Sequence, residues 1–419
     1  MKLNSVAKAA SMVLLTLGVQ TAAAAVWVDT QKWSNEWEEK YSAWVETEFN
    51  PRYFIDGPYG KLATDCADAV YAARVIFSYE NKLPFVIKNP YGTGYYTNKT
   101  SNYDSKKEGK ERVRSFLYNI FDQTSTKSLP NDTYPVAINR MNVRSGTVWL
   151  RPSREEEFSL ARIFGGKDQR PGHTDLVKSV SREGVVTLIG STVPSAVREL
   201  KEVTDFYILP EIKVQTGLRN WKWPEHYNLK ENQLPGYGVD QYEMGAQMSN
   251  HGEAGPQQGS KTVQGWSQAL REKLALTKES KGAYLTRLAK NFCVLVKERV
   301  AIVASGEKLR NRMGGSCMDY AQWDNYSTPG RDQMVVKSLK KLIAETNMFP
   351  FLSRSSVEKT RPYLETCGTL EIIPGRIVDY TELAIRYSED LISSDPNHPI
   401  EARWGEMQKP RSTCAYKEQ

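Results

Sequence analysis

The five cysteines are spread unevenly along this 419-residue chain, and that distribution limits how the chain can be cross-linked. Cys66 stands alone in the first part, whereas the other four lie in the last third: Cys293, Cys317, Cys367 and Cys414. In an oxidising compartment these four can form two disulfides, by any of three pairings, which leaves Cys66 as a free thiol. Each bridge would stabilise the fold by on the order of 2–4 kcal/mol, because it limits the unfolded chain.

The first 25 residues have the features of a secretory signal peptide. Lys2 and Lys8 give a positive start, residues 12–17 are mostly apolar, and residues 22–25 are small residues suited to cleavage. No later segment approaches the roughly 18 apolar residues of a membrane-spanning helix. We therefore expect an exported protein, periplasmic or secreted, without an integral membrane segment.

Charge and motifs together give no indication of a nucleic-acid partner. The formal charge falls from +7 to +5 when Lys2 and Lys8 leave with the signal peptide, since no acidic residue is lost. This mild positive charge tolerates anionic wall polymers or membranes, but no arginine-rich run or nucleic-acid motif is present, so we expect no nucleic-acid partner.

Changes in composition predict an α+β protein in several parts. Aromatic residues at 33, 37, 41 and 44 follow one face of a helix within residues 26–49, which is typical of a packing face. Residues 50–249 mix a strong helix with β-rich segments, and residues 250–262 are polar and glycine-rich, as in a linker or long loop. Residues 263–419 are predicted to form a mostly helical, disulfide-containing domain, with its clearest helix from Gly282 to about Ser305.

Cys66 lies at the predicted start of a helix. Thr64 or Asp65 can cap this helix, its apolar residues run from Ala69 to Phe77, and Asn81-Lys82 ends it. The free N–H groups at a helix start favour a thiolate, which suits a nucleophile. Flanking carboxylates at 65 and 68 act the other way and raise the thiol pKa. Cys66 is therefore either a catalytic nucleophile or a small buried residue without chemistry.

His173 opens a predicted β-hairpin about a hundred residues later. Residues 173–180 alternate like a half-buried strand, Arg182-Glu183-Gly184 makes a turn, and residues 185–189 return. The other three histidines, at 226, 251 and 398, have weaker context for a base. On its own, a strand histidine can equally be structural, and no HExxH or CxxC spacing indicates a metal site.

The segment Asp65-Cys66 before a helix, followed by Leu83-Pro84 and by Gly172-His173 opening a strand, resembles the papain-like fold. The nearest forms are the bacterial NlpC-like and CHAP-type cell-wall peptidases and the transglutaminase-like peptidases. The resemblance covers about residues 64–191 and implies a cysteine-bearing helix packed on an antiparallel sheet. Where those families place an orienting residue on the second strand, Thr187 and Ser191 are the nearest polar residues.

A cysteine peptidase or amidase needs a thiol nucleophile, an imidazole base and donors for the oxyanion. Cys66 would attack the carbonyl, His173 would take the thiol proton, and the backbone N–H of Cys66 could hold the oxyanion. Asp175 shares a strand face with His173 and could hold a neighbouring group or a substrate amine. Adjacent same-face side chains point outward in parallel, which makes direct orientation of His173 by Asp175 awkward. The scheme requires no cofactor and no metal.

The sequence thus predicts an exported cysteine peptidase or amidase acting on a peptide or peptidoglycan-like substrate. The alternative is a non-catalytic exported binding or scaffold protein with the same fold. An aromatic cluster, Trp221, Trp223 and Tyr227, is either a substrate rim or a hydrophobic plug. The C-terminal domain is expected to be structural, to cover a cleft or to bind a protein partner.

Overall fold

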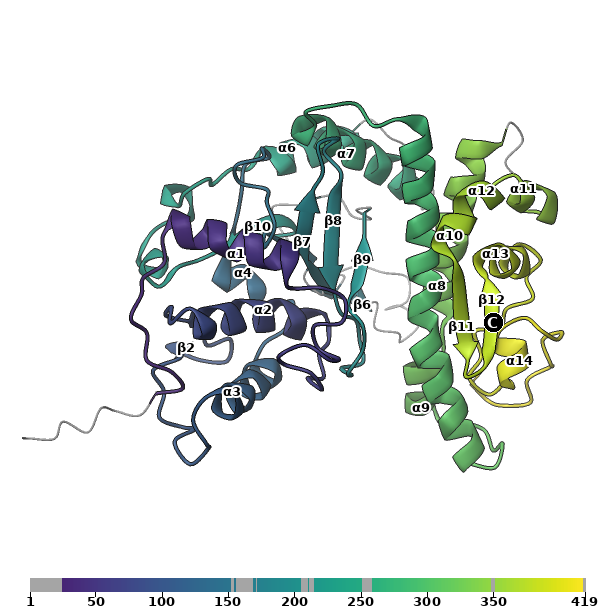
Figure 1. The fold of residues 1–419 in the computed structure, drawn as a ribbon, viewed down its shortest axis with the longest axis horizontal. Coiled ribbons are helices and arrows are strands. Elements are labelled where there is room, and N and C mark those ends of the chain that lie inside the picture. The colour runs from purple at the N-terminus through teal and green to yellow at the C-terminus, as the bar shows by residue number, and fades with distance from the viewer. Residues whose placement is uncertain are drawn as a thin grey trace, which may run out of the picture.

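The structure of the chain is a computed structural model (Figure 1). The described residues are 25–151, 154–155, 169–170, 172–204, 210, 215–250, 258–347 and 351–416. The predicted signal peptide, apart from Ala25, and the middle of the predicted linker, residues 251–257, lie outside this part of the chain.

A six-stranded antiparallel sheet forms the centre of the N-terminal part, in the order β3-β10-β4-β7-β8-β9. Its strands are β3 (Thr133–Pro135), β4 (Val148–Arg151), β7 (His173–Val180), β8 (Val186–Gly190), β9 (Lys201–Val203) and β10 (Gly217–Trp221). The predicted hairpin at residues 173–189 is confirmed as β7 and β8. Two small two-stranded sheets accompany it: β1 (Val86–Lys88) with β2 (Tyr95–Thr97), and β5 (Arg154–Glu155) with β6 (Gln169–Arg170).

Helices cover both faces of this sheet. Successive side chains along each strand point to opposite faces and therefore enter two different hydrophobic cores. Leu150, Leu176 and Ile189 share one core with the helices α1 (Asn35–Thr47), α2 (Cys66–Glu80) and α3 (Lys110–Gln123). Trp149 and Val177 share the other with α7 (Gln258–Leu274). Shorter helical segments complete this part: α4 (Leu129–Asp132), η2 (Pro224–Asn228), η3 (Glu231–Gln233) and α6 (Asp240–Asn250).

The aromatic stripe on α1 is a packing face, as predicted. Trp33, just before the helix, and Tyr41 are buried, and Trp37 and Trp44 pack against the same core. All four lie near Phe77 of α2, with ring centroids 5.2–6.4 Å apart. The stripe therefore fixes α1 against the helix that begins at Cys66.

The C-terminal part is built around the long helix α8 (Lys281–Arg312), which stands between the sheet and the remaining elements in Figure 1. Those elements are α9 (Tyr320–Tyr326), α10 (Pro329–Thr346), α11 (Arg354–Glu358), α12 (Arg361–Leu364), η4 (Glu365–Cys367), β11 (Thr369–Ile373), β12 (Arg376–Asp379), α13 (Tyr380–Ser388) and α14 (Ile400–Arg403). Two disulfides, Cys293–Cys367 and Cys317–Cys414, cross-link this part. The four late cysteines pair among themselves, as predicted, and one of the three pairings is now assigned.

Mixed helix and sheet confirm the predicted α+β class. Two boundaries differ from the predictions. Gln258–Thr262, expected in a linker, begin α7, and α8 ends at Arg312, seven residues beyond the predicted end at Ser305. Among the described residues, no helix is both long and apolar enough to cross a bilayer.

Candidate functional site

Cys66 is the first residue of α2, as the sequence predicts. Asp65 caps the helix and forms a reciprocal capping box with Asp68. The first helical hydrogen bond runs from Ala69 N–H to the Asp65 carbonyl, so the N–H groups of Cys66 and Ala67 lie outside the helix's own ladder. The N–H of Cys66 is suited to hold an oxyanion beside the sulfur, whereas the N–H of Ala67 faces the sulfur itself.

The Cys66 thiol is free and buried, with the residue only 4% exposed. Burial, together with the carboxylates of Asp65 and Asp175, raises the pKa of the thiol to about 12. The backbone N–H groups of Ala67 and Thr174 point at the sulfur and act in the opposite direction, but they do not outweigh burial. At neutral pH the Cys66 side chain is therefore a protonated thiol and not a preformed thiolate.

His173 and Asp175 form a close pair at the start of β7. His173 Nε2 lies 3.1 Å from Asp175 Oδ2, and the Asp175 side chain is almost fully buried. The expectation that parallel side chains would make direct orientation of His173 by Asp175 awkward is wrong, because the imidazole and the carboxylate are in contact. Since Nε2 faces Asp175, Nδ1 is the nitrogen left for proton transfer. The Trp149 ring packs edge-on against the imidazole, with centroids 6.0 Å apart.

Gly190 on the neighbouring strand makes this pair possible. Leu176 is in register with Ile189, which puts Asp175 opposite Gly190. A Cβ on Gly190 would come within 1.9 Å of Asp175 Oδ1, so the carboxylate fills the space that any other residue would occupy. The carboxylate of Asp175 on β7 thus occupies the side-chain position of Gly190 on β8.

A second charged pair stabilises the ionised form of Asp175. Burial alone would raise the pKa of this carboxyl, but His173, Lys201 and Arg151 outweigh it and lower the pKa. Lys201 on β9 lies 3.3 Å from Glu298 on α8, and burial of the ammonium is offset by Glu298 and Asp175. The long helix α8 is therefore connected electrostatically to the His173–Asp175 pair. Sequence reasoning missed Lys201 and Glu298, for which no local signal exists.

Cys66 and His173 are brought to the same end of the sheet. The N–H of Thr174, the residue after His173, faces the Cys66 sulfur. Within the described part of the chain, no hydrogen bond joins the Cys66 sulfur to the His173 ring. Next to Gly190 a groove of about 630 Å³ begins, bounded by β9 and α8.

The aromatic cluster occupies a different place. Trp221 is buried on β10, whereas Tyr227 is half-buried and its hydroxyl donates to Asp132 Oδ1 and to the Val86 carbonyl. Trp223 stacks on His226 and, with Trp221, lines a separate cavity. That cavity adjoins the start of β4, whereas His173 pairs with Arg151 at the other end of β4.

Among the described residues, no group of three or more His, Cys, Asp and Glu side chains is arranged to hold a metal ion. Comparison with protein-family models, curated proteins and solved structures found no match to this chain. Function is therefore inferred from the chemistry of the residues around Cys66.

Proposed function

We propose that the protein is an exported cysteine peptidase or amidase in which Cys66 is the nucleophile, His173 the base and Asp175 the residue that orients the base. The observation that carries this proposal is the 3.1 Å contact of His173 Nε2 with Asp175, one residue from the N–H group that faces the Cys66 sulfur. A helix that begins with a cysteine and packs on an antiparallel sheet, with the histidine on a strand of that sheet, supports a papain-like core.

The first half of the reaction forms an acyl-enzyme. The Cys66 sulfur attacks the carbonyl carbon of the scissile amide while His173 Nδ1 takes the thiol proton. The carbonyl oxygen becomes an oxyanion held by the backbone N–H of Cys66. The C–N bond then breaks, His173 gives the proton to the leaving amine, and a thioester on Cys66 remains.

Water completes the cycle. His173 takes a proton from a water molecule as its oxygen attacks the thioester carbon. The C–S bond breaks, a carboxylic acid leaves, and the proton returns to the Cys66 sulfur. Throughout, Asp175 keeps the Nε2 proton of His173 in place and stabilises the imidazolium that forms at each proton transfer.

A protonated nucleophile is consistent with this scheme. Because the pKa of Cys66 is raised to about 12, a stable thiolate–imidazolium pair cannot form first. Proton transfer must accompany sulfur attack, as in hydroxyl nucleophiles activated by a histidine. The buried Asp175 carboxylate contacts the other ring nitrogen and stabilises the positive charge that His173 gains when it takes the proton.

The groove between β9 and α8 is the proposed substrate entrance. It begins at Gly190 and Ser191, is lined by Lys201 and Glu298, and has room for several residues of a peptide. Its mixed charges suit a peptide or the peptide cross-link of a cell-wall polymer. The predicted signal peptide and the two disulfides support export to the periplasm or beyond. In this proposal the helical part forms one wall of the groove and is the candidate surface for a protein partner.

A specific observation favours the alternative, a non-catalytic binding or scaffold protein. Cys66 is buried, and its sulfur has no hydrogen bond to His173 within the described residues. A thiol held in this way can serve packing alone. The two proposals differ in whether the sulfur ever receives an acyl group.

Turnover of peptides and of cell-wall fragments tests the proposal. We expect the wild type to release new amines, and Cys66→Ser and His173→Ala to lose at least about 100-fold in rate, since general base catalysis contributes roughly 10²–10⁴-fold. Cys66→Ala provides a control for packing, because it removes the sulfur and leaves the helix start intact. Equal turnover by wild type and Cys66→Ala would contradict the enzyme and favour the binding protein.

A further inference from the structure

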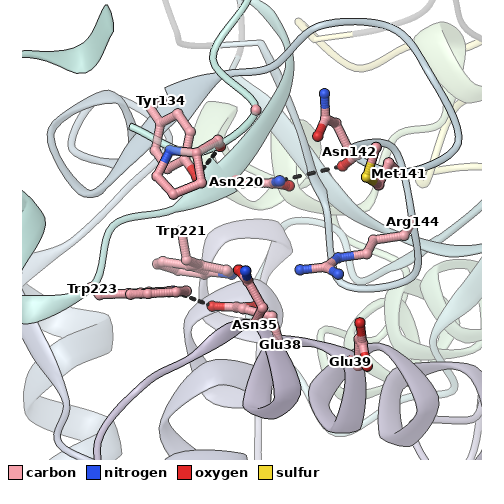
Figure 2. A pocket seen from close by; sticks show the side chains of 12 residues that line it. Asn35, Glu38, Glu39, Tyr134, Met141, Asn142, Arg144, Asn220, Trp221 and Trp223 are labelled. Atoms are coloured by element: carbon pink, nitrogen blue, oxygen red, sulfur yellow. Dashed lines mark hydrogen bonds between the residues drawn. The ribbon is translucent and has the colours of Figure 1, made fainter. Parts of the chain in front are cut away.

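A second cavity, of about 230 Å³, lies away from Cys66 (Figure 2). The first turn of α1, the loop before β4 and the end of β10 enclose it. It lies below the roughly 300–1,000 Å³ of pockets for drug-sized ligands, so it suits a molecule of the size of one amino acid.

Arg144 is the distinctive group in this cavity. Its side chain is half-buried and points across the cavity toward Asn35 and Trp221 (Figure 2). Among the described residues its guanidinium has neither a hydrogen-bond acceptor nor an ion-pair partner. A partly desolvated cation without a counter-charge is costly, and a guanidinium offers paired donors that match a carboxylate.

One of the two carboxylates that line the cavity, Glu38, is already occupied. Glu38 accepts two hydrogen bonds from Arg74, at 2.6 and 3.1 Å, and a third from the Trp223 indole at 2.6 Å. Its charge is thereby balanced by a buried arginine on α2. Glu39 is exposed at the rim, where a solvated carboxylate neutralises Arg144 only weakly. The cavity therefore presents a positive group beside a polar wall.

The rest of the lining is aromatic or amide. The Tyr134 and Trp223 rings are held in place, since the Tyr134 hydroxyl donates to the Pro235 carbonyl and Trp223 stacks on His226. Asn220 accepts from Thr147 and donates to the Asn142 carbonyl, so this wall is ordered. Rigid aromatic faces beside one unpaired cation are suited to an apolar body that carries an anionic end.

We propose that this cavity binds the α-carboxylate of an amino-acid residue with an apolar or aromatic side chain, with Arg144 on the carboxylate and Trp223 and Tyr134 against the side chain. The residue is either a free amino acid or the C-terminal residue of a peptide. Glu39 at the rim would meet the ammonium group of a free amino acid. The site stands apart from Cys66 and does not depend on hydrolysis.

Tryptophan fluorescence can measure binding, because Trp221 and Trp223 line the cavity. The probes are phenylalanine, N-acetylphenylalanine and N-acetylphenylalanine amide, which lacks the carboxylate. We expect saturable binding of at least one acid and an affinity for the amide at least about 10-fold lower, as loss of a charge-assisted hydrogen bond costs about 1.5–3 kcal/mol. Tighter binding of N-acetylphenylalanine assigns the site to peptide ends, and tighter binding of phenylalanine assigns it to free amino acids.

Arg144→Gln should weaken binding of the acid to the level of the amide, and Arg144→Lys should give an intermediate loss because it keeps the charge without the paired donors. Arg182→Gln, at an exposed arginine on the β7–β8 turn, is the matched control and should bind as the wild type does. Equal affinity for acid and amide, full binding by Arg144→Gln, or no saturable signal with either acid would overturn the proposal.

Discussion

The carboxylate of Asp175 on β7 occupies the side-chain position of Gly190 on β8. A Cβ at Gly190 would lie 1.9 Å from Asp175 Oδ1, while Oδ2 of the same carboxylate lies 3.1 Å from His173 Nε2. The carboxylate that contacts His173 therefore comes from β7, and the glycine on β8 leaves the space that this carboxylate occupies.

Gly190→Ala should therefore disrupt the site and destabilise the fold. The new methyl group must displace Asp175 or separate the strands, and overpacking of a tight site costs about 1–3 kcal/mol. We expect the free energy of unfolding in urea to fall by this amount, together with any hydrolytic rate. Gly282→Ala in α8 is the control, since nothing lies within 4 Å of a Cβ there. If Gly190→Ala were as stable as Gly282→Ala, the close approach to Asp175 would be wrong.

Asp68 should make stability depend on pH between about 4 and 7. Burial, together with repulsion from Asp65, raises the pKa of this carboxyl from 3.8 to about 7. A folded-state pKa above the unfolded value means that the folded protein holds the proton more tightly, so the contribution to stability is complete below pH 4 and is lost as the pH rises through 7.

The variant Asp68→Asn isolates this contribution, because its amide oxygen can still accept from the Asp65 N–H. From pH 4.5 to 7.5, the unfolding free energy of the wild type should fall relative to that of the variant, by about 1 kcal/mol or more. Urea unfolding at both pH values measures the difference. Parallel pH profiles for the two proteins would show that Asp68 titrates normally.

The two disulfides should differ in their importance. Each closes a long loop, with sequence separations of 74 and 97 residues, so chain entropy alone predicts similar contributions of roughly 4–5 kcal/mol. Cys293 also lies inside the core formed by α8 and its neighbours, whereas Cys317 is exposed and Cys414 is near the C-terminus.

Replacing Cys293 and Cys367 by serine should thus lower stability more than replacing Cys317 and Cys414, because it also introduces a hydroxyl into apolar packing. Thermal unfolding of the two double variants gives the order. A larger loss for the Cys317–Cys414 pair would contradict this assignment of the core.

Local sequence patterns predicted the parts of the site that depend on neighbouring residues. The Asp65 cap, the helix after Cys66 and the strand that starts at His173 follow from short-range periodicity and capping chemistry. Counting the cysteines predicted that the last four pair among themselves. It did not predict which of the three possible pairings forms.

The parts of the site that the sequence did not predict depend on contacts between segments that are distant in the chain. Whether Asp175 meets His173 depends on the register of β7 with β8, which brings Gly190 opposite the carboxylate. The Lys201–Glu298 pair joins residues 97 positions apart in the sequence. The aromatic cluster near Trp221 was ambiguous for the same reason, since composition does not show which core a side chain enters.

Acylation of Cys66 by p-nitrophenyl acetate, followed by peptide mapping in the mass spectrometer, tests the central claim most directly. With both disulfides intact, Cys66 is the one free thiol among the described residues. We predict a transient acetyl group on Cys66 at neutral pH in the wild type. In His173→Ala the adduct should form only as the pH rises toward the thiol pKa of about 12. An adduct that forms equally fast at neutral pH without His173, or a wild-type Cys66 that stays unmodified at neutral pH, would contradict the assignment of Cys66 and His173 as nucleophile and base.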